Sequence, residues 1–285
     1  MVGPHQFYPS PQTHFALGKG MRCVPEQRTP TQNHILAALP RHVYERLAPD
    51  LEPYPLPLGW TVHDAGDREN YLYFLTAGIV SRFYVTTAGA SAEFAVTGNE
   101  GVIGIASFLG GESTPSQAMV LSTGYSYRLR ADRLKHEFAH DGPLPRLLLR
   151  YIQSLIGQIG LICACRRHHS LEQRFCRWLL SCLDRLPTND LALTQGLIAN
   201  MLGVRRAGVT DAAGKLQEAG LIHLSRGRIV VLDRRGLEAR VCECYAVVKR
   251  EYDRLLADYQ GVDGDSKAPL ITSVHAFSQQ SEALV

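Results

Sequence analysis

The sequence predicts an α+β fold in which an N-terminal antiparallel jelly-roll barrel precedes a long helix and a C-terminal helical domain. Three observations support this prediction. Short β-prone runs separated by glycines fill residues 56–129, apolar residues recur at helical spacing over residues 144–167, and two short helical stripes meet at a glycine within residues 193–222. The length of 285 residues allows two domains.

Positive charge is unevenly distributed along the chain. The composition, with 45% apolar and 20% charged residues, is ordinary for a globular protein. Residues 1–165 hold 13 basic and 13 acidic residues, whereas residues 166–256 hold 16 basic and 10 acidic ones. The excess of positive charge lies in the C-terminal domain, which indicates a nucleic-acid partner.

Both ends of the chain lack the patterns of folded segments. Residues 1–32 contain five prolines among polar residues and no signal peptide or membrane anchor, so we expect a disordered arm there. Residues 260–285 return to Gly, Ser, Gln and acidic residues, which predicts a disordered tail. Seven cysteines, an odd number, favour a reducing cytoplasm over a disulfide framework.

The predicted barrel occupies residues 33–143. Asn33 is expected to cap a short helix through Leu39, and a second helix is expected from His42 to Ala48. Glycines, Gly78 and Gly124 among them, separate short strands in the manner of a jelly roll. The expected strands are Leu56–His63, Tyr71–Thr76, Ile79–Thr86, Ala92–Val96, Ala118–Ser122 and Tyr125–Leu129.

Residues 144–167 predict a dimerisation helix, because apolar residues recur at alternating spacings of four and three. This heptad seam consists of Leu148, Ile152, Leu155, Ile159 and Ile162. Further apolar positions, Leu149 and Ile156 among them, indicate a helix that packs on its twin along one side and on its own barrel along another. A membrane span is the alternative, but the charge-free run of 15 residues is shorter than the roughly 20 required.

The segment from Leu193 to Ile222 predicts a helix-turn-helix. Thr194 caps the first helix, Gly203 ends it, and Gly220 ends the second. The buried sides of the two helices are expected to consist of Leu197, Ile198, Met201, Leu202, Val209, Ala213 and Leu216. The flanking segments extend this domain over residues 168–259, with a helix capped by Ser170 before it and one amphipathic helix from Arg235 to Tyr259 after it.

Two arginines begin the second helix of this pair. Cations there oppose the helix dipole and cost roughly 0.3–1 kcal/mol, whereas Ser, Thr, Asp or Asn would cap the end. Arg205 and Arg206 are therefore best explained by an anion, and forked cations suit DNA phosphates and guanine edges. A pair of packing helices that does not bind DNA is the alternative interpretation of these two helices.

A basic β-hairpin is predicted directly after the second helix. Leu221–Leu224 and Arg228–Leu232 are short apolar runs separated by a turn at residues 225–227. Such a hairpin is the wing of a winged helix-turn-helix, in which Arg226 and Arg228 would contact the phosphate backbone. From Asn33 to Leu232 the sequence resembles the Crp/Fnr superfamily of bacterial transcription regulators.

The resemblance implies a homodimeric, cytoplasmic transcription regulator with an effector-sensing barrel. Residues 72–85 resemble the central hairpin of the superfamily's barrel. The implied partners are double-stranded DNA, a second copy of the chain, RNA polymerase and an effector that the sequence does not identify. The expected DNA-binding residues are Thr194, Arg205, Arg206, Ala207, Thr210, Asp211, Arg226 and Arg228.

The recognition helix follows the superfamily's pattern only in part. That pattern is a Ser or Thr cap, then Arg, then Glu, and another Arg four residues after the Glu. This sequence has Arg205, Arg206, Ala207 and Asp211 at those positions, so Arg206 alone matches. We therefore expect an operator that differs from the superfamily's common half-site.

The barrel also departs from the superfamily members that bind cyclic nucleotides. In those members a Gly-Glu pair holds the ribose and an Arg holds the cyclic phosphate. The alignment places Ile105 at the Glu position and Ser116 at the Arg position, so a cyclic nucleotide is not expected as the effector. Arg82 or Arg128 could still reach the barrel from a neighbouring strand.

No metal site or cofactor is expected from the cysteines. Cys163 and Cys165, and likewise Cys242 and Cys244, form close pairs, but residues i and i+2 on a regular helix point about 200° apart and cannot bind one ion. The superfamily includes an iron–sulfur oxygen sensor with an N-terminal cysteine cluster, whereas this sequence has only Cys23 there. Packing is the expected role of these cysteines.

Three other functional hypotheses follow from single features. His168 and His169 lie at the expected hinge and would either form a protonation switch or be part of a solvated basic surface. A cupin-type enzyme would need several histidines on the barrel strands, where the sequence offers only His63 between residues 56 and 129, so no catalytic residue is expected. A ligand-binding or protein-binding module without DNA is the alternative class, and Arg205 and Arg206 count against it.

Overall fold

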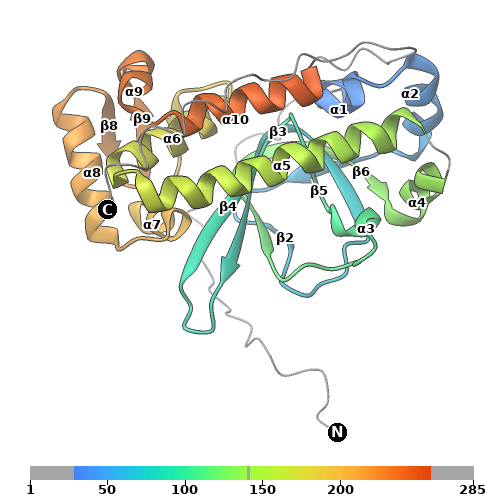
Figure 1. Ribbon diagram of the computed structural model, residues 1–285, viewed down its shortest axis with the longest axis horizontal. Coiled ribbons are helices and arrows are strands. Elements are labelled where there is room, and N and C mark those ends of the chain that lie inside the picture. Colours follow the sequence, from blue (N-terminus) through green and yellow to red (C-terminus); the bar gives the residue numbers. More distant parts are fainter. Residues whose placement is uncertain (1–28, 140–141, 258–285) are drawn as a thin grey trace, which may run out of the picture.

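In the computed structural model two helices, α5 (Pro143–His168) and α10 (Cys244–Tyr252), pack side by side along a β-barrel, with a small helical domain at one end (Figure 1). The structure describes residues 29–139 and 142–257. The predicted disordered arm and tail therefore lie largely outside the described residues. The end of the predicted arm is ordered, because Pro30–Gln32 form a 3₁₀ helix, η1.

A buried asparagine starts the folded part of the chain. The side-chain oxygen of Asn33 accepts the N–H groups of Ile35 and Leu36, which confirms the predicted cap. Its amide nitrogen donates to the carbonyls of Leu75 and Gly101 at 2.9 Å, so the cap also fixes the first helices to the barrel. These helices are α1 (His34–Ala37), α2 (Arg41–Leu47) and the 3₁₀ helix η2 (Ala48–Asp50).

The barrel is a sheet of antiparallel strands in the order β1-β6-β3-β4, with β2 paired to β6 and β5 paired to β3. Its strands are β1 (Glu52–Leu56), β2 (Thr61–His63), β3 (Tyr71–Val85), β4 (Ser91–Thr97), β5 (Val102–Ile103) and β6 (Gln117–Arg130). Two short helices flank it, α3 (Ala106–Leu109) and α4 (Ala131–Ala139). The predicted antiparallel barrel is thus confirmed.

The predicted breaks at Gly78 and Gly124 are wrong. Both glycines lie inside long strands, β3 and β6, where the register shifts. Gly78 has a φ of +83°, and a Cβ on Gly124 would lie 2.0 Å from the carbonyl oxygen of Ala77. The glycines are needed because the two backbones approach closely at a bulge, and not because the chain turns.

Helix α5 has apolar residues on several sides and is 26 residues long. By length and composition it is long and apolar enough to cross a membrane, so the length of its charge-free run alone does not decide the question. In the structure the buried side packs on the barrel and on the C-terminal helices, together with Leu72, Phe74 and Tyr252. Such packing accounts for the apolar residues on the buried side of the helix.

The C-terminal domain contains the predicted helix-turn-helix and wing. Ser170 and Gln173 form the predicted capping box at the start of α6 (Leu171–Leu183). Helices α7 (Gln195–Leu202) and α8 (Arg206–Glu218) are followed by the hairpin of β8 (Ile222–Ser225) and β9 (Arg228–Val231). A short strand, β7 (Asp190–Leu191), pairs with β9 to complete a sheet of three strands.

The single helix expected from Arg235 to Tyr259 is wrong. The chain instead forms α9 (Arg234–Arg240), leaves the helical conformation at Val241, and resumes in α10. Helix α10 passes into a π-helical segment, η3 (Asp253–Ala257). The break contains neither Gly nor Pro, so helix propensity does not predict it.

Candidate nucleic-acid interface and its junction with the barrel

The two helices of the helix-turn-helix bury the predicted apolar sides. Ile198, Met201 and Leu202 of α7 are at most 3% exposed, and Val209, Ala213 and Leu216 of α8 are fully buried; Leu197 is half-buried. Gly203 has a φ of +64° at the end of α7, and Gly220 has a φ of +72° after α8. Both left-handed positions favour glycine, as the sequence predicts.

The N-terminus of α8 carries cations and has no side-chain cap. Arg205 is the N-cap residue, in extended conformation, and its side chain makes no cap hydrogen bond. Arg205, Arg206 and Ala207 are all exposed. The structure therefore leaves two guanidinium groups and the positive end of a helix dipole on one accessible surface, an arrangement that attracts phosphate.

The remaining predicted contact residues border this surface. Thr194 caps α7 by accepting the N–H of Leu197, and it is exposed. Thr210 is exposed and lies 2.9 Å from the side-chain oxygen of Gln195, which links the two helices. Asp211 pairs with Lys215 at 2.9 Å on the exposed side of α8. This ion pair reduces the negative charge that Asp211 would bring to a DNA surface.

The two arginines of the wing have different environments. Arg226 is exposed in the turn between β8 and β9. The guanidinium of Arg228 instead forms an ion pair with Asp190 on β7. A contact between Arg228 and phosphate would therefore compete with this pair, whereas the exposed position of Arg226 leaves its side chain accessible to phosphate.

Two further arginines hold the helix-turn-helix at the end of α5. Arg166 donates to the carbonyls of Met201, at 3.2 Å, and Glu93, and Arg174 donates to the carbonyl of Leu202 at 2.5 Å. The carbonyls of Met201 and Leu202 lie at the C-terminus of α7, where they need donors. The sequence shows both arginines only as part of a basic segment, because their partners are far away along the chain.

A buried carboxylate joins the barrel to the DNA-binding domain. Glu93 on β4 accepts from the hydroxyl of Ser81 at 2.6 Å and from the indole N–H of Trp178, on α6, at 2.8 Å. Burial raises the pKa of Glu93 to about 7, although these hydrogen bonds and the charges of Arg177 and Arg166 oppose the rise. Glu93 is therefore a titratable group within the junction.

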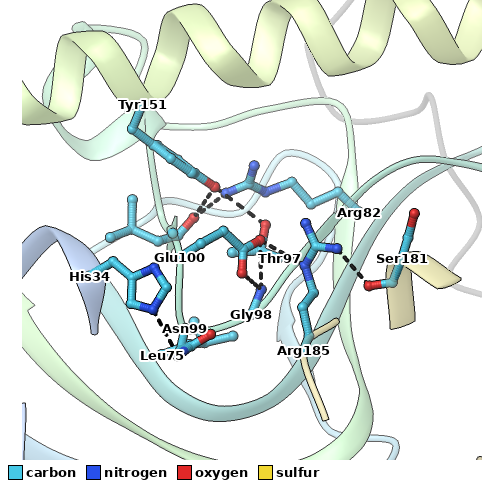
Figure 2. A network of polar contacts seen from close by, with 12 residues as sticks. His34, Leu75, Arg82, Thr97, Gly98, Asn99, Glu100, Tyr151, Ser181 and Arg185 are labelled. Atoms are coloured by element: carbon cyan, nitrogen blue, oxygen red, sulfur yellow. Dashed lines mark hydrogen bonds and ion pairs between the residues drawn. The ribbon is translucent and has the colours of Figure 1, made fainter. Parts of the chain in front are cut away.

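A second polar contact crosses the same junction, as Figure 2 shows. Glu100 follows β4 and pairs with Arg185 after α6 at 2.7 Å; both side chains are largely buried. On the side of α5, Tyr151 donates to the carbonyl of Val102 at 3.1 Å. Apolar side chains of β3, β4 and β6 also join the core of the DNA-binding domain, so barrel and domain are packed as one body.

Arg82 and Arg128, the two arginines that could reach the barrel interior, have different environments. Arg82 is 3% exposed and donates to the carbonyl of Val102, and its Nη1 has no hydrogen-bond partner among the described residues. Arg128 is less buried, with its side chain 23% exposed; it pairs with Glu52 and lies over the rings of Tyr54 and Tyr71 at 4.5 and 4.0 Å. Arg82 is thus the buried cation of the barrel.

A carboxylate from before β3 contacts the segment that aligns with the superfamily's cassette. Glu69 accepts the N–H of Ala106 at 2.6 Å and lies 3.2 Å from His63, whose pKa is lowered by burial. Ser116 is 3% exposed and lies 3.0 Å from the hydroxyl of Thr114. Two cavities border Glu69: one, beside His63 and Gly104, has a volume of about 170 Å³, and the other, beside Ser107 and Glu112, about 490 Å³. Only the second lies within the roughly 300–1,000 Å³ of typical ligand pockets.

The predicted dimer seam of α5 faces the wrong way at three of its five positions. Leu148, Leu155 and Ile162 are at most 4% exposed and contribute to the chain's own cores or lie beside them, so they are not free to meet a second copy. Ile152 and Ile159 are half-buried. A different heptad stripe is exposed, which consists of Arg146, Leu149, Gln153, Ile156, Gly160, Cys163 and Arg167.

The structure brings together cysteines that are far apart in the sequence. Cys165 and His169 at the end of α5 lie beside Cys242, in the break between α9 and α10, and Cys244, the first residue of α10; their four possible ligand atoms are within 4.8 Å of one another. Cys163 is exposed and lies outside this group. The sequence analysis assumed that both cysteine pairs lie on a regular helix. This is correct for Cys163 and Cys165, but wrong for Cys242 and Cys244, because their segment is not a regular helix.

Two family models match the chain. Residues 173–240 match the Crp-like helix-turn-helix domain, and residues 55–141 match the cyclic nucleotide-binding domain. The global nitrogen regulator of Nostoc sp. strain PCC 7120 is 26% identical over 181 residues, which cover 60% of this chain and 81% of that relative. The regulator of the same name from Synechocystis sp. strain PCC 6803 is 26% identical over 213 residues, or 70% of this chain and 93% of that one.

Solved structures share the fold. FixK2 from Bradyrhizobium japonicum has a TM-score of 0.58 at 17% identity, covering 67% of this chain and 98% of that chain. A CRP-family transcriptional regulator from Thermus thermophilus, TTHB099, has a TM-score of 0.55 at 20% identity, covering 66% and 95%. A barrel joined to a winged helix-turn-helix of this kind defines a DNA-binding transcription regulator. The chain belongs to the Crp/Fnr family of these regulators.

Proposed function

We propose that the chain is a homodimer that reads a two-fold operator through α8. The observation that carries the proposal is the exposed N-terminus of α8, where Arg205 and Arg206 lie together without a side-chain cap. Arg206 would contact a guanine edge, with Ala207 and Thr210 facing neighbouring bases. Thr194, Arg205 and Arg226 would contact phosphates and so position the helix in the major groove.

The dimer contact would be made by the exposed stripe of α5 defined above. Leu149 and Ile156 are 53% and 64% exposed and lie seven residues apart on the same side of α5, the spacing of equivalent positions in a heptad. The stripe keeps heptad spacing, and Gly160 would let two helices approach closely. The half-buried Ile152 and Ile159 would border the contact.

The effector of the barrel would be something other than a cyclic nucleotide. The N–H of Ala106 is already occupied by the carboxylate of Glu69, and negative charge at that place repels an anionic ligand. Ser116 offers a hydroxyl where the family's nucleotide binders have a guanidinium. Arg82 is the feature that would favour an anionic ligand, because it places a buried cation inside the barrel.

Other parts of the proposal rest on the family. Crp-type regulators bind DNA and act without catalysing a reaction, and we propose the same for this chain, with RNA polymerase as a partner and the cytoplasm as its location. The alternative, a binding module without specific DNA binding, is not favoured by the match to the Crp-like helix-turn-helix domain.

Selection of bound fragments from random double-stranded DNA tests the proposed function. We expect an inverted repeat with half-sites one or more helical turns apart, because a two-fold dimer places its recognition helices at that spacing. A selected motif without two-fold symmetry would contradict the dimeric operator. Enrichment of no motif at all would contradict sequence-specific binding.

A further inference from the structure

Four side chains with metal-binding groups converge at the place where α5 enters the DNA-binding domain. Cys165 Sγ lies 3.6 Å from Cys242 Sγ, and Cys244 Sγ lies 3.6 Å from His169 Nδ1. The three cysteines are buried together, and His169 is half-buried at the edge of this cluster. We propose that Cys165, His169, Cys242 and Cys244 bind one Zn²⁺ ion.

The distances fit a single tetrahedral ion. With Zn–S bonds of about 2.3 Å and Zn–N bonds of about 2.0–2.1 Å, a tetrahedron places two sulfurs about 3.8 Å apart and a sulfur and a nitrogen about 3.6 Å apart. The observed separations of 3.6 Å agree with both edges. An iron–sulfur cluster distributes its ligands over different iron atoms, so four ligand atoms within 4.8 Å of one another favour one ion.

The backbone is arranged for these ligands. Cys165 lies in the last turn of α5, and His169 is the C-cap residue, whose N–H donates to the carbonyl of Cys165 at 3.0 Å, so the end of the helix brings the two residues together. Val241 is extended, with a φ of −73° and a ψ of 152°, and the side chain of Glu243 makes no cap hydrogen bond at the start of α10. The helix is therefore interrupted where the two cysteines occur, without a residue that would break it.

The surroundings of the cluster suit a metal site. Glu243 lies 3.3 Å from His169 Nε2, on the opposite side of the ring from the thiols. A carboxylate there holds the proton on Nε2 and leaves Nδ1 to bind the ion. Three thiolates and a neutral imidazole around Zn²⁺ carry a net charge of about −1. Arg177, which is 8% exposed and lies close to Cys165, would balance that charge.

The position of the ion gives it a defined role. Cys165 and His169 belong to the helix that carries the barrel, whereas Cys242 and Cys244 belong to the segment that follows the wing. The ion would therefore link the segments that precede and follow the winged helix-turn-helix, and so fix the DNA-binding domain to α5. Binding would displace the three thiol protons to solvent, because thiolates are the ligands.

Metal analysis of the purified full chain tests the proposal directly. After expression with zinc and iron both supplied and purification without a histidine tag, we expect about one zinc per chain by mass spectrometry of the metals. Cobalt supplied in place of zinc should give the visible absorption of tetrahedral thiolate-bound Co²⁺. A chain without metal, a chain containing iron and sulfide, or a Cys165–Cys242 disulfide in the fresh protein would each overturn the proposal.

Single variants test which residues are ligands. Cys242→Ser and Cys165→Ser should lower zinc occupancy at least tenfold, and Cys163→Ser, two residues from a proposed ligand, should leave it unchanged. Glu243→Gln should keep the ion but weaken its affinity by roughly 10–100-fold in competition with a chelator. Loss of zinc from Cys163→Ser, or full occupancy in Cys242→Ser, would contradict the assigned ligands. Should a cysteine variant fail to fold, the wild-type metal content and Glu243→Gln still decide the matter.

Discussion

The indole Nε1 of Trp178 donates a 2.8 Å hydrogen bond to the carboxylate of Glu93, so the first long helix of the DNA-binding domain is tied to a strand of the barrel by a buried acid. Ser81 completes the site from β3, and Arg166 and Arg177 supply positive charge from α5 and α6. This contact lies between the part of the molecule that would sense an effector and the part that contacts DNA. A change in its protonation therefore acts on the junction.

Stability should depend on pH through Glu93. Its pKa rises from 4.5 to about 7 on folding, so between these values the native state binds a proton that the unfolded state lacks. The free energy of unfolding should then fall as pH rises through this window, by up to about 1.4 kcal/mol per pH unit. Urea unfolding of wild type and Glu93→Gln across the window measures the difference, with Glu45→Gln as a control. Parallel pH profiles of wild type and Glu93→Gln would contradict the assignment.

A charge on the exposed stripe of α5 should separate the dimer. Ile156→Glu places a carboxylate where the two helices would meet, and its exposure predicts a change in monomer stability within about 0.5 kcal/mol. Sedimentation should show monomers for this variant and dimers for Ala246→Glu, on the exposed side of α10. Leu155→Ala instead removes a buried side chain and should cost about 2–5 kcal/mol of stability. A dimeric Ile156→Glu would place the contact on another surface.

Cyclic AMP and cyclic GMP should neither bind the barrel nor change its affinity for DNA. Ser116 provides a hydroxyl where nucleotide binders of the family use a guanidinium. The carboxylate of Glu69 already occupies the N–H of Ala106, where those binders leave room for the phosphate. Calorimetric titration of the purified protein measures this directly. Micromolar binding that disappears in Arg82→Gln would show that the buried arginine serves as the phosphate ligand, and the proposed exclusion of cyclic nucleotides would be wrong.

Removal of the wing-tip cation should weaken binding to all DNA sequences alike. Arg226 lies in an exposed turn, so Arg226→Ala should lower the slope of log affinity against log salt by about one. Arg228→Ala should change the slope less, because Asp190 already pairs with that arginine. Titrations of labelled duplex at several salt concentrations compare the two. An unchanged slope in Arg226→Ala would exclude the wing tip from the interface.

Local sequence signals predict the helix-turn-helix well. Other features depend on contacts between residues far apart in the sequence, and these the sequence does not reveal. The caps at Ser170 and Thr194 and the left-handed glycines at 203 and 220 act within a few residues, so the sequence specifies them directly. The side of α5 that is buried depends on the barrel and on α10, which no pattern within the helix reveals. The exposed and buried stripes both have heptad spacing, and only packing distinguishes them.

The cysteine cluster could not be predicted for the same physical reason. Cys165 and Cys242 are 77 residues apart in the sequence and meet only because the chain folds back along α5. The break between α9 and α10 contains no helix-breaking residue, so the sequence pattern favours a continuous helix. Arg166, Arg174 and Glu93 likewise have partners that are distant along the chain. The sequence alone shows each of them only as a basic or acidic residue.

Recognition of bases by the start of α8 is the central claim, and Arg206→Ala tests it most directly. Affinity is measured by titration for the selected operator, for operators with single base changes, and for random duplex. We expect the variant to lose about 1–3 kcal/mol on the operator, little on random DNA, and its preference at one base position in each half-site. Equal losses on operator and random DNA, with the base preference intact, would contradict the claim and assign Arg206 to a phosphate.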